Sequence, residues 1–141
     1  MSFDTDENLV KVLLDTNILV SAIVFGGKPE QILHSVLEEE FLAIISPVLL
    51  AELKEVLNKK FPQRETDFTL TIKNIEEIFR TIQPKEIINI LRDDDDNRVL
   101  EAAIEGNCEY IVTGDKELLR LKSYQNVKIV TADQFLKLTK F

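Results

Sequence analysis

The chain has few of the residues on which several common kinds of site depend. Its 141 residues include one cysteine and one histidine. A single cysteine cannot form an intramolecular disulfide, and Cys108 lies in no metal-binding motif, so we expect a buried apolar thiol and a reducing, cytoplasmic environment. His34 falls in an amphipathic segment far from every other motif. Its position disfavours a zinc site and a serine–histidine or cysteine–histidine nucleophile.

Long apolar runs and an excess of positive charge are also missing. No apolar run approaches the roughly 20 residues that a membrane helix requires, and the chain opens with acidic residues where a signal peptide is basic. We therefore expect no membrane contact and no export. The formal net charge of -8 argues against tight, sequence-indifferent binding of nucleic acid, because such binding depends on lysine and arginine.

An acidic chain can still act on a phosphodiester if cations neutralise its carboxylates and a local basic patch guides the strand. Two groups of basic residues could form such a patch: Lys59, Lys60 and Arg64, or Lys116, Arg120 and Lys122. An ordinary solvated surface is the equally weighted alternative for both groups. The aromatic residues have core-like spacing and predict no stacking platform; they include Phe25, Phe61, Phe68, Phe79, Tyr110 and Tyr124.

Apolar segments typical of strands alternate with amphipathic helical segments from residue 10 onward, which indicates repeated βαβ units. We predict a three-layer α/β/α fold with a mostly parallel five-stranded sheet. The predicted strands are residues 10–14, 41–45 and 86–90, a segment from residue 110 that ends at Asp115, and residues 127–130. The predicted helices are residues 29–40, 47–60, 68–82 and 93–105, a short one through Leu119, and a last one from Ala132. We expect residues 1–8 to be flexible and residues 9–141 to form a single domain.

Two of the predicted strands end at a carboxylate. Asp15 closes the first strand, and Asp115 follows the strand that begins at residue 110. Because open α/β sheets bind ligands outside the carboxyl ends of their strands, the two acids should meet at one edge. Carboxylates gathered there predict a divalent-cation site.

Four consecutive aspartates, residues 93–96, precede a predicted helix. At about 100° per residue, Asp96 falls in the middle of the apolar face formed by Val99, Leu100 and Ala103. Asp96 should therefore point toward the sheet, where a carboxylate is costly unless it is paired or binds a cation. Asp94 and Asp95 lie toward the side or outside of the helix and suit its N-terminus.

Other polar residues have structural interpretations when each is taken alone. Glu52 borders the apolar stripe of the helix from Pro47 and could be an ordinary surface glutamate. Ser46 and Asp115 are each good N-caps for the helices that follow them. Only their combination favours a functional site.

In this combination the chain resembles the PIN domain (PilT N-terminus) nucleases, especially those assigned as toxins of toxin–antitoxin systems. The resemblance covers nearly all of residues 10–138. It rests on Leu14–Asn17, on Ser46–Pro47 with Leu49–Leu53, on Asp96 with Val99, Leu100 and Ala103, and on Val112–Leu118, in this order and on these elements. Where relatives often have proline after Asp93, this chain has Asp94.

The resemblance implies both a site and an activity. It implies that Asp15, Glu52, Asp96 and Asp115 are the acidic catalytic and metal-site residues, with Asn17, Ser46 and Thr113 as polar support. Carboxylate and water oxygens suit Mg²⁺ or Mn²⁺, so one or two such ions are the expected cofactors. The implied activity is metal-dependent hydrolysis of RNA to products with 5′-phosphate and 3′-hydroxyl ends. The expected partners are RNA, an antitoxin protein and a second copy in a homodimer.

Three alternatives stay open at this point. A signalling receiver would require paired acids after the first strand, but Asp15 is followed by Thr16 and Asn17. A haloacid-dehalogenase-like phosphatase would require a second aspartate where Asn17 stands. A PIN fold that binds RNA or supports an assembly without cleaving remains the main alternative, although the four acids disfavour it.

Overall fold

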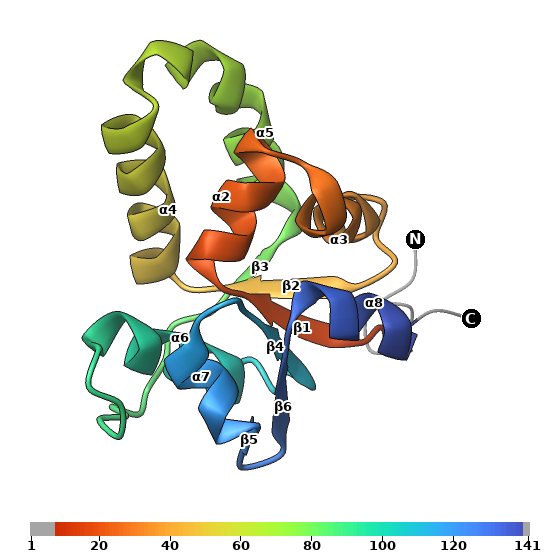
Figure 1. The fold of residues 1–141 in the computed structure, drawn as a ribbon, viewed down its shortest axis with the longest axis vertical. Coiled ribbons are helices and arrows are strands. Elements are labelled where there is room, and N and C mark those ends of the chain that lie inside the picture. The colour runs from red at the N-terminus through yellow and green to blue at the C-terminus, as the bar shows by residue number, and fades with distance from the viewer. Residues whose placement is uncertain (1–7, 140–141) are drawn as a thin grey trace.

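One sheet of six strands organises the protein in the computed structural model, which describes residues 8–139 (Figure 1). The strands are β1 (Lys11–Leu14), β2 (Leu42–Ile45), β3 (Arg80–Thr81), β4 (Tyr110–Val112), β5 (Ser123–Tyr124) and β6 (Val127–Val130). Their spatial order is β3-β2-β1-β4-β6-β5, and only the β5–β6 pair is antiparallel. The predicted mostly parallel α/β fold is confirmed, but the sheet has six strands and not five.

The strand predicted at residues 86–90 is wrong. The third strand is instead β3, which lies within the predicted helix of residues 68–82. Residues 86–90 contain three isoleucines, which suit a strand. Their backbone N–H groups instead bond to side chains of the helix at residues 94–105: Ile88 N–H donates to Glu101 Oε2 at 2.8 Å, and Ile90 N–H donates to Asn97 Oδ1 at 3.3 Å. The two-residue strand β5 is too short to leave an apolar pattern.

The helices lie close to their predicted ranges. They are α2 (Thr16–Val24), α3 (Gly27–Leu37), α4 (Pro47–Lys60), α5 (Glu65–Ile78), α6 (Asp94–Glu105), α7 (Lys116–Leu121) and α8 (Ala132–Thr139), with a 3-10 turn at Pro62–Arg64. Helix α2, directly after Asp15, is the exception, because it is not among the predicted helices. The break between α2 and α3 falls at Gly26, whose φ of 83° favours glycine.

Helices cover both sides of the sheet. In Figure 1, α2 to α5 lie on one side of β1 and β2, and α6 and α7 lie on the other. The buried core joins these layers through side chains such as Leu13, Ile44 and Ile111, while Cys108 is a buried free thiol, as expected. No helix within residues 8–139 is long and apolar enough to cross a membrane. Apart from Asn8, the segment predicted to be flexible lies outside the described residues.

Candidate metal centre at the carboxyl edge of the sheet

The ends of the two central strands bring Asp15 and Thr113 together. Strands β1 and β4 pair in parallel with Leu14 opposite Val112, so the next residue of each emerges at the same edge. The Thr113 hydroxyl donates to Asp15 Oδ2 at 2.7 Å and accepts a hydrogen bond from the Asp115 N–H at 2.9 Å. Thr113 therefore links the two aspartates whose meeting the sequence predicts.

Asp15 is buried, and burial raises its pKa. The hydrogen bond from Thr113 and the backbone N–H groups of Thr16 and Asn17 lower that pKa, while the charge of Asp115 raises it. Asp115 itself is half-buried, and its Oδ1 accepts hydrogen bonds from the N–H groups of Glu117 and Leu118. It is thus both the N-cap of α7 and one of the acids at this edge of the sheet. We call Asp15, Glu52, Asp96 and Asp115 together the acidic edge.

Asp96 points inward from the first turn of α6, as the helical periodicity predicts. Its residue surface is only 6 % exposed, and its Oδ2 is buried without a hydrogen-bond partner. Burial, followed by the nearby charges of Asp115, Asp93, Asp15 and Asp95, raises the pKa of Asp96 to about 7. The unpartnered oxygen among like charges suits a cation, which would supply the missing interaction.

Glu52 reaches this edge from the second turn of α4. The Thr16 hydroxyl donates to Glu52 Oε1 at 2.7 Å. Burial raises the pKa of Glu52, and Asp95 raises it further through its charge and through a hydrogen bond between the two carboxyl groups. Sequence reasoning missed Thr16 and treated Asp95 only as a helix-end residue, because contacts between α2, α4 and α6 leave no signal in the sequence.

The polar residues expected to support the site differ in their surroundings. Ser46 is fully buried, and its hydroxyl accepts from the Leu49 N–H at 3.4 Å, which confirms it as the N-cap of α4. Asn17 is exposed, and its side chain forms no hydrogen bond with residues 8–139. His34 lies exposed on α3, 3.6 Å from Glu38, away from the acidic edge.

The acids lie near one another but do not form a complete set of metal ligands within residues 8–139. In the part of the chain that the structure describes, no three acidic, histidine or cysteine side chains converge closely enough to ligate one ion as they stand. The donors are all carboxylate oxygens, and one is buried without a partner. This set fits Mg²⁺ or Mn²⁺, which prefer oxygen ligands and keep several waters.

A polar clamp holds α6 against the loop of residues 82–93. Arg98 forms a two-pronged ion pair with Glu101, at 2.7 Å for each contact, and donates to the Ile88 carbonyl at 3.1 Å. The Asn97 side chain accepts from the Leu91 N–H and donates to the Leu91 carbonyl, both at 2.9 Å. Sequence reasoning did not single out these residues, although they fix the helix that carries Asp96.

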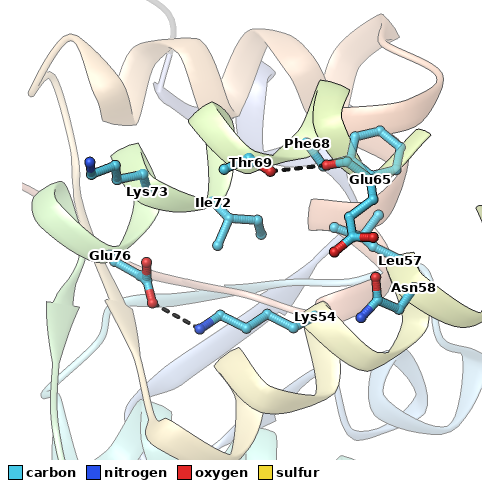
Figure 2. A pocket seen from close by; sticks show the side chains of 9 residues that line it. All are labelled: Lys54, Leu57, Asn58, Glu65, Phe68, Thr69, Ile72, Lys73 and Glu76. Atoms are coloured by element: carbon cyan, nitrogen blue, oxygen red, sulfur yellow. Dashed lines mark hydrogen bonds and ion pairs between the residues drawn. The ribbon is translucent and has the colours of Figure 1, made fainter. Parts of the chain in front are cut away.

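A cavity lies elsewhere, between α4 and α5 (Figure 2). It has a volume of about 360 Å³ and an apolar floor that includes Leu57 and Ile72. An ion pair of 2.9 Å between Lys54 and Glu76 crosses it. Lys54 is two residues from Glu52, about 200° around the helix, so the cavity and the acidic edge use different faces of α4.

These features define an α/β protein with an acidic site at the carboxyl edge of its sheet. A sequence profile of the PIN domain matches residues 11–117, most of the chain, and the protein therefore belongs to the PIN domain family. The chain is 28 % identical to uncharacterized protein MJ1680 of Methanocaldococcus jannaschii over 141 aligned positions, covering 91 % of this chain and 90 % of that protein.

Two solved structures share the fold. One is VapBC2 from Rickettsia felis bound to a DNA fragment from their promoter, with a TM-score of 0.59 and 19 % identity over 85 % of this chain and 97 % of that one. The other is PAE2754 from Pyrobaculum aerophilum, with a TM-score of 0.59 and 14 % identity over 99 % of this chain and 95 % of that one. At these identities the likeness concerns the fold alone.

Proposed function

We propose that the protein is a divalent-metal-dependent endoribonuclease. The observation that carries this proposal is the buried, unpartnered Oδ2 of Asp96 among neighbouring carboxylates. Asp15, Glu52, Asp96 and Asp115 would hold one or two Mg²⁺ or Mn²⁺ ions. A bound ion of this kind lowers the pKa of water and stabilises charge on the leaving oxygen of a phosphodiester. The products would carry 5′-phosphate and 3′-hydroxyl ends.

The contribution of the protein's own side chains is to position the acids. The Thr113 hydroxyl donates to Asp15 Oδ2 and the Thr16 hydroxyl donates to Glu52 Oε1, so these two hydrogen bonds fix the orientation of both carboxylates. Asp96 must lose a proton that its surroundings retain to about pH 7. Cation binding and proton release by Asp96 should therefore be coupled.

The choice of RNA and the role as a toxin rest on family membership. The fold likeness to VapBC2, a toxin–antitoxin complex, supports an antitoxin protein as a partner. A homodimer is the accompanying proposal for the toxin itself. A PIN fold that binds RNA or supports an assembly without cleavage is the second candidate, and the lack of a preformed three-ligand cluster within residues 8–139 favours it.

Cleavage of single-stranded and structured RNAs tests the proposal. Purified protein would be assayed in EDTA, Mg²⁺ and Mn²⁺, with the ends of the products identified. We expect cleavage with either ion, and a loss of about 100-fold or more in the Asp96→Asn variant. The matched control is Asp94→Asn, because Asp94 lies in the same aspartate run but is exposed. Cation binding without cleavage of any RNA would favour the second candidate, and absence of cation binding would contradict the catalytic site.

A further inference from the structure

An aromatic cluster with one exposed ring lies at the far end of α2 and α4 from the acidic edge. Phe25, at the C-terminal end of α2, is 75 % exposed. Its ring centroid lies 6.1 Å from that of Phe61, just beyond α4, and the two rings are inclined by 76°. Phe61 in turn meets the buried ring of Phe68 at 6.3 Å. We call Phe25, Phe61 and Phe68 the aromatic platform.

The platform has a defined distance from the acidic edge. The Thr16–Glu52 hydrogen bond joins α2 and α4 near the sheet, and the Phe25–Phe61 contact joins the same two segments nine residues further along each. The helices therefore run side by side in the same direction, as Figure 1 shows. Nine residues at about 1.5 Å each give about 13.5 Å. At a rise of about 3.4 Å per nucleotide, this span corresponds to roughly four stacked nucleotides.

Positive charge accompanies the platform in a chain whose formal net charge is -8. The Arg64 guanidinium carbon lies 5.0 Å from the centre of the Phe68 ring. Lys60 is exposed and forms no ion pair within residues 8–139. Arg64 pairs with Asp67 at 3.4 Å, but both side chains are exposed, so a phosphate could compete for this arginine.

An aromatic cluster that has one exposed ring, Phe25, and a cation over its buried ring, Phe68, suits an anionic ligand that also has flat rings. Single-stranded nucleic acid meets both requirements, because its bases stack on aromatic side chains while lysine and arginine follow its phosphates. An apolar protein segment would not require the cations. Sequence spacing did not predict this arrangement, since the three rings come from separate segments of the chain.

We infer that the aromatic platform is a distal subsite for single-stranded RNA, on which a base about four nucleotides from the acidic edge stacks against Phe25. Lys60 and Arg64 contact the phosphates beside that base. The inference rests on the proposed function for its RNA substrate. It assigns the outer ends of α2 and α4 to binding and leaves the chemistry at the acidic edge.

Binding of single-stranded RNAs longer and shorter than this span, measured by fluorescence anisotropy in Mg²⁺, tests the inference. Phe25→Leu keeps an apolar side chain and removes the ring. We expect it to weaken binding of the longer RNA about five-fold or more and to leave the shorter RNA unaffected. Lys60→Ala should weaken binding and reduce the dependence of log K on log salt by about one unit. Leu138→Ala, at an exposed apolar residue of α8, is the control and should bind like wild type.

The outcomes separate the subsite from the nuclease proposal. Equal binding by wild type and Phe25→Leu overturns the subsite, whether or not the RNA is cleaved. Self-association that Phe25→Leu abolishes, with RNA binding unchanged, also overturns it and makes the platform a protein interface. Phe25-dependent binding without cleavage of any RNA supports the subsite while contradicting the nuclease. Thermal unfolding of each variant checks that the fold is retained.

Discussion

Two buried carboxylates on α6 have opposite surroundings. Glu101 is 8 % exposed. Its oxygens accept two hydrogen bonds from Arg98 and one from the Ile88 N–H. Asp96 is 6 % exposed, has a buried oxygen without a partner, and lies among other acids. The two residues are five positions apart on one helix, so the helix itself does not explain the difference.

The difference separates a carboxylate that supports the fold from one that is available for binding. A buried charge with complete hydrogen bonding is neutral or favourable to the fold, whereas an unpaired one destabilises it. The clamp of Asn97, Arg98 and Glu101 fixes α6 against the preceding loop, and Asp96 lies on the same helix. We therefore expect Arg98→Ala and Asp96→Asn to change stability in opposite directions.

The largest expected effect is the loss of the clamp. Arg98→Ala leaves Glu101 buried without its cation, which should lower the free energy of unfolding by about 3 kcal/mol. Urea denaturation measures this change. Arg120→Ala is the matched control, because Arg120 forms the same three-residue-spaced pair with Glu117 on an exposed surface and should lose about 0.5 kcal/mol or less. Equal losses in the two variants would contradict the structural role of the clamp.

Cation binding should stabilise the fold, because a cation offsets the repulsion among the carboxylates of the acidic edge. Mg²⁺ or Mn²⁺ at about 100 times its dissociation constant should raise the free energy of unfolding by about 2.7 kcal/mol. Thermal unfolding across a cation titration measures the effect. Asp94→Asn should respond like wild type and Asp96→Asn should respond far less. An unfolding temperature that no concentration of either ion changes would count against the site.

Without cations, the stability of the fold should decrease as the pH rises through the range in which the acidic edge loses its protons. The pKa of Asp96 rises from its ordinary value of 3.8 to about 7 on folding, so the folded state binds this proton more tightly than the unfolded chain. Between these two values each step up in pH therefore favours unfolding, and the raised pKa values of Asp15 and Glu52 act in the same direction. Unfolding temperatures in EDTA from pH 4 to pH 8 measure the trend.

The Asp96→Asn variant should have a shallower dependence on pH and should be about 1 kcal/mol more stable than wild type near pH 8, because it removes a buried charge. Stability that rises steadily from pH 4 to pH 7 in EDTA would contradict the account of Asp96.

The last prediction concerns Thr16, which positions Glu52. Thr16→Val preserves the shape of a buried side chain but removes the hydroxyl that donates to Glu52 Oε1. We expect a loss of about 1 kcal/mol in stability and about ten-fold weaker cation binding, measured by calorimetry. Thr69→Val is the control, since the Thr69 hydroxyl bonds only to its own helix at the Glu65 carbonyl. Unchanged cation affinity in Thr16→Val would leave this threonine a purely structural role.

Periodicity predicted the residues whose position depends on one element. The helical angle of Asp96 and the capping roles of Ser46 and Asp115 follow from local sequence, and the structure confirms all three. The parallel sheet followed from the alternation of strands and helices. These features depend on neighbours within a few residues, which a single sequence displays.

Features that depend on contacts between distant segments were wrong or missed. Residues 86–90 resemble a strand, but their backbone donors bond to side chains of α6. The Thr16–Glu52 contact and the Phe25–Phe61 contact each join residues 36 positions apart. No periodicity within one element contains that information.

The contacts of Asn97 restrict how the chain can vary in length. Asn97 is fully buried and bonds to Leu91, while Asp96 beside it faces the acidic edge. A register shift of one residue would turn α6 by about 100° and exchange these two environments. Surface loops ordinarily accept insertions and deletions, but the segment between β3 and α6 sets the rotation of a helix. Single-residue insertions between Leu91 and Asp96 should therefore be far less acceptable than insertions in the turn at Gly26.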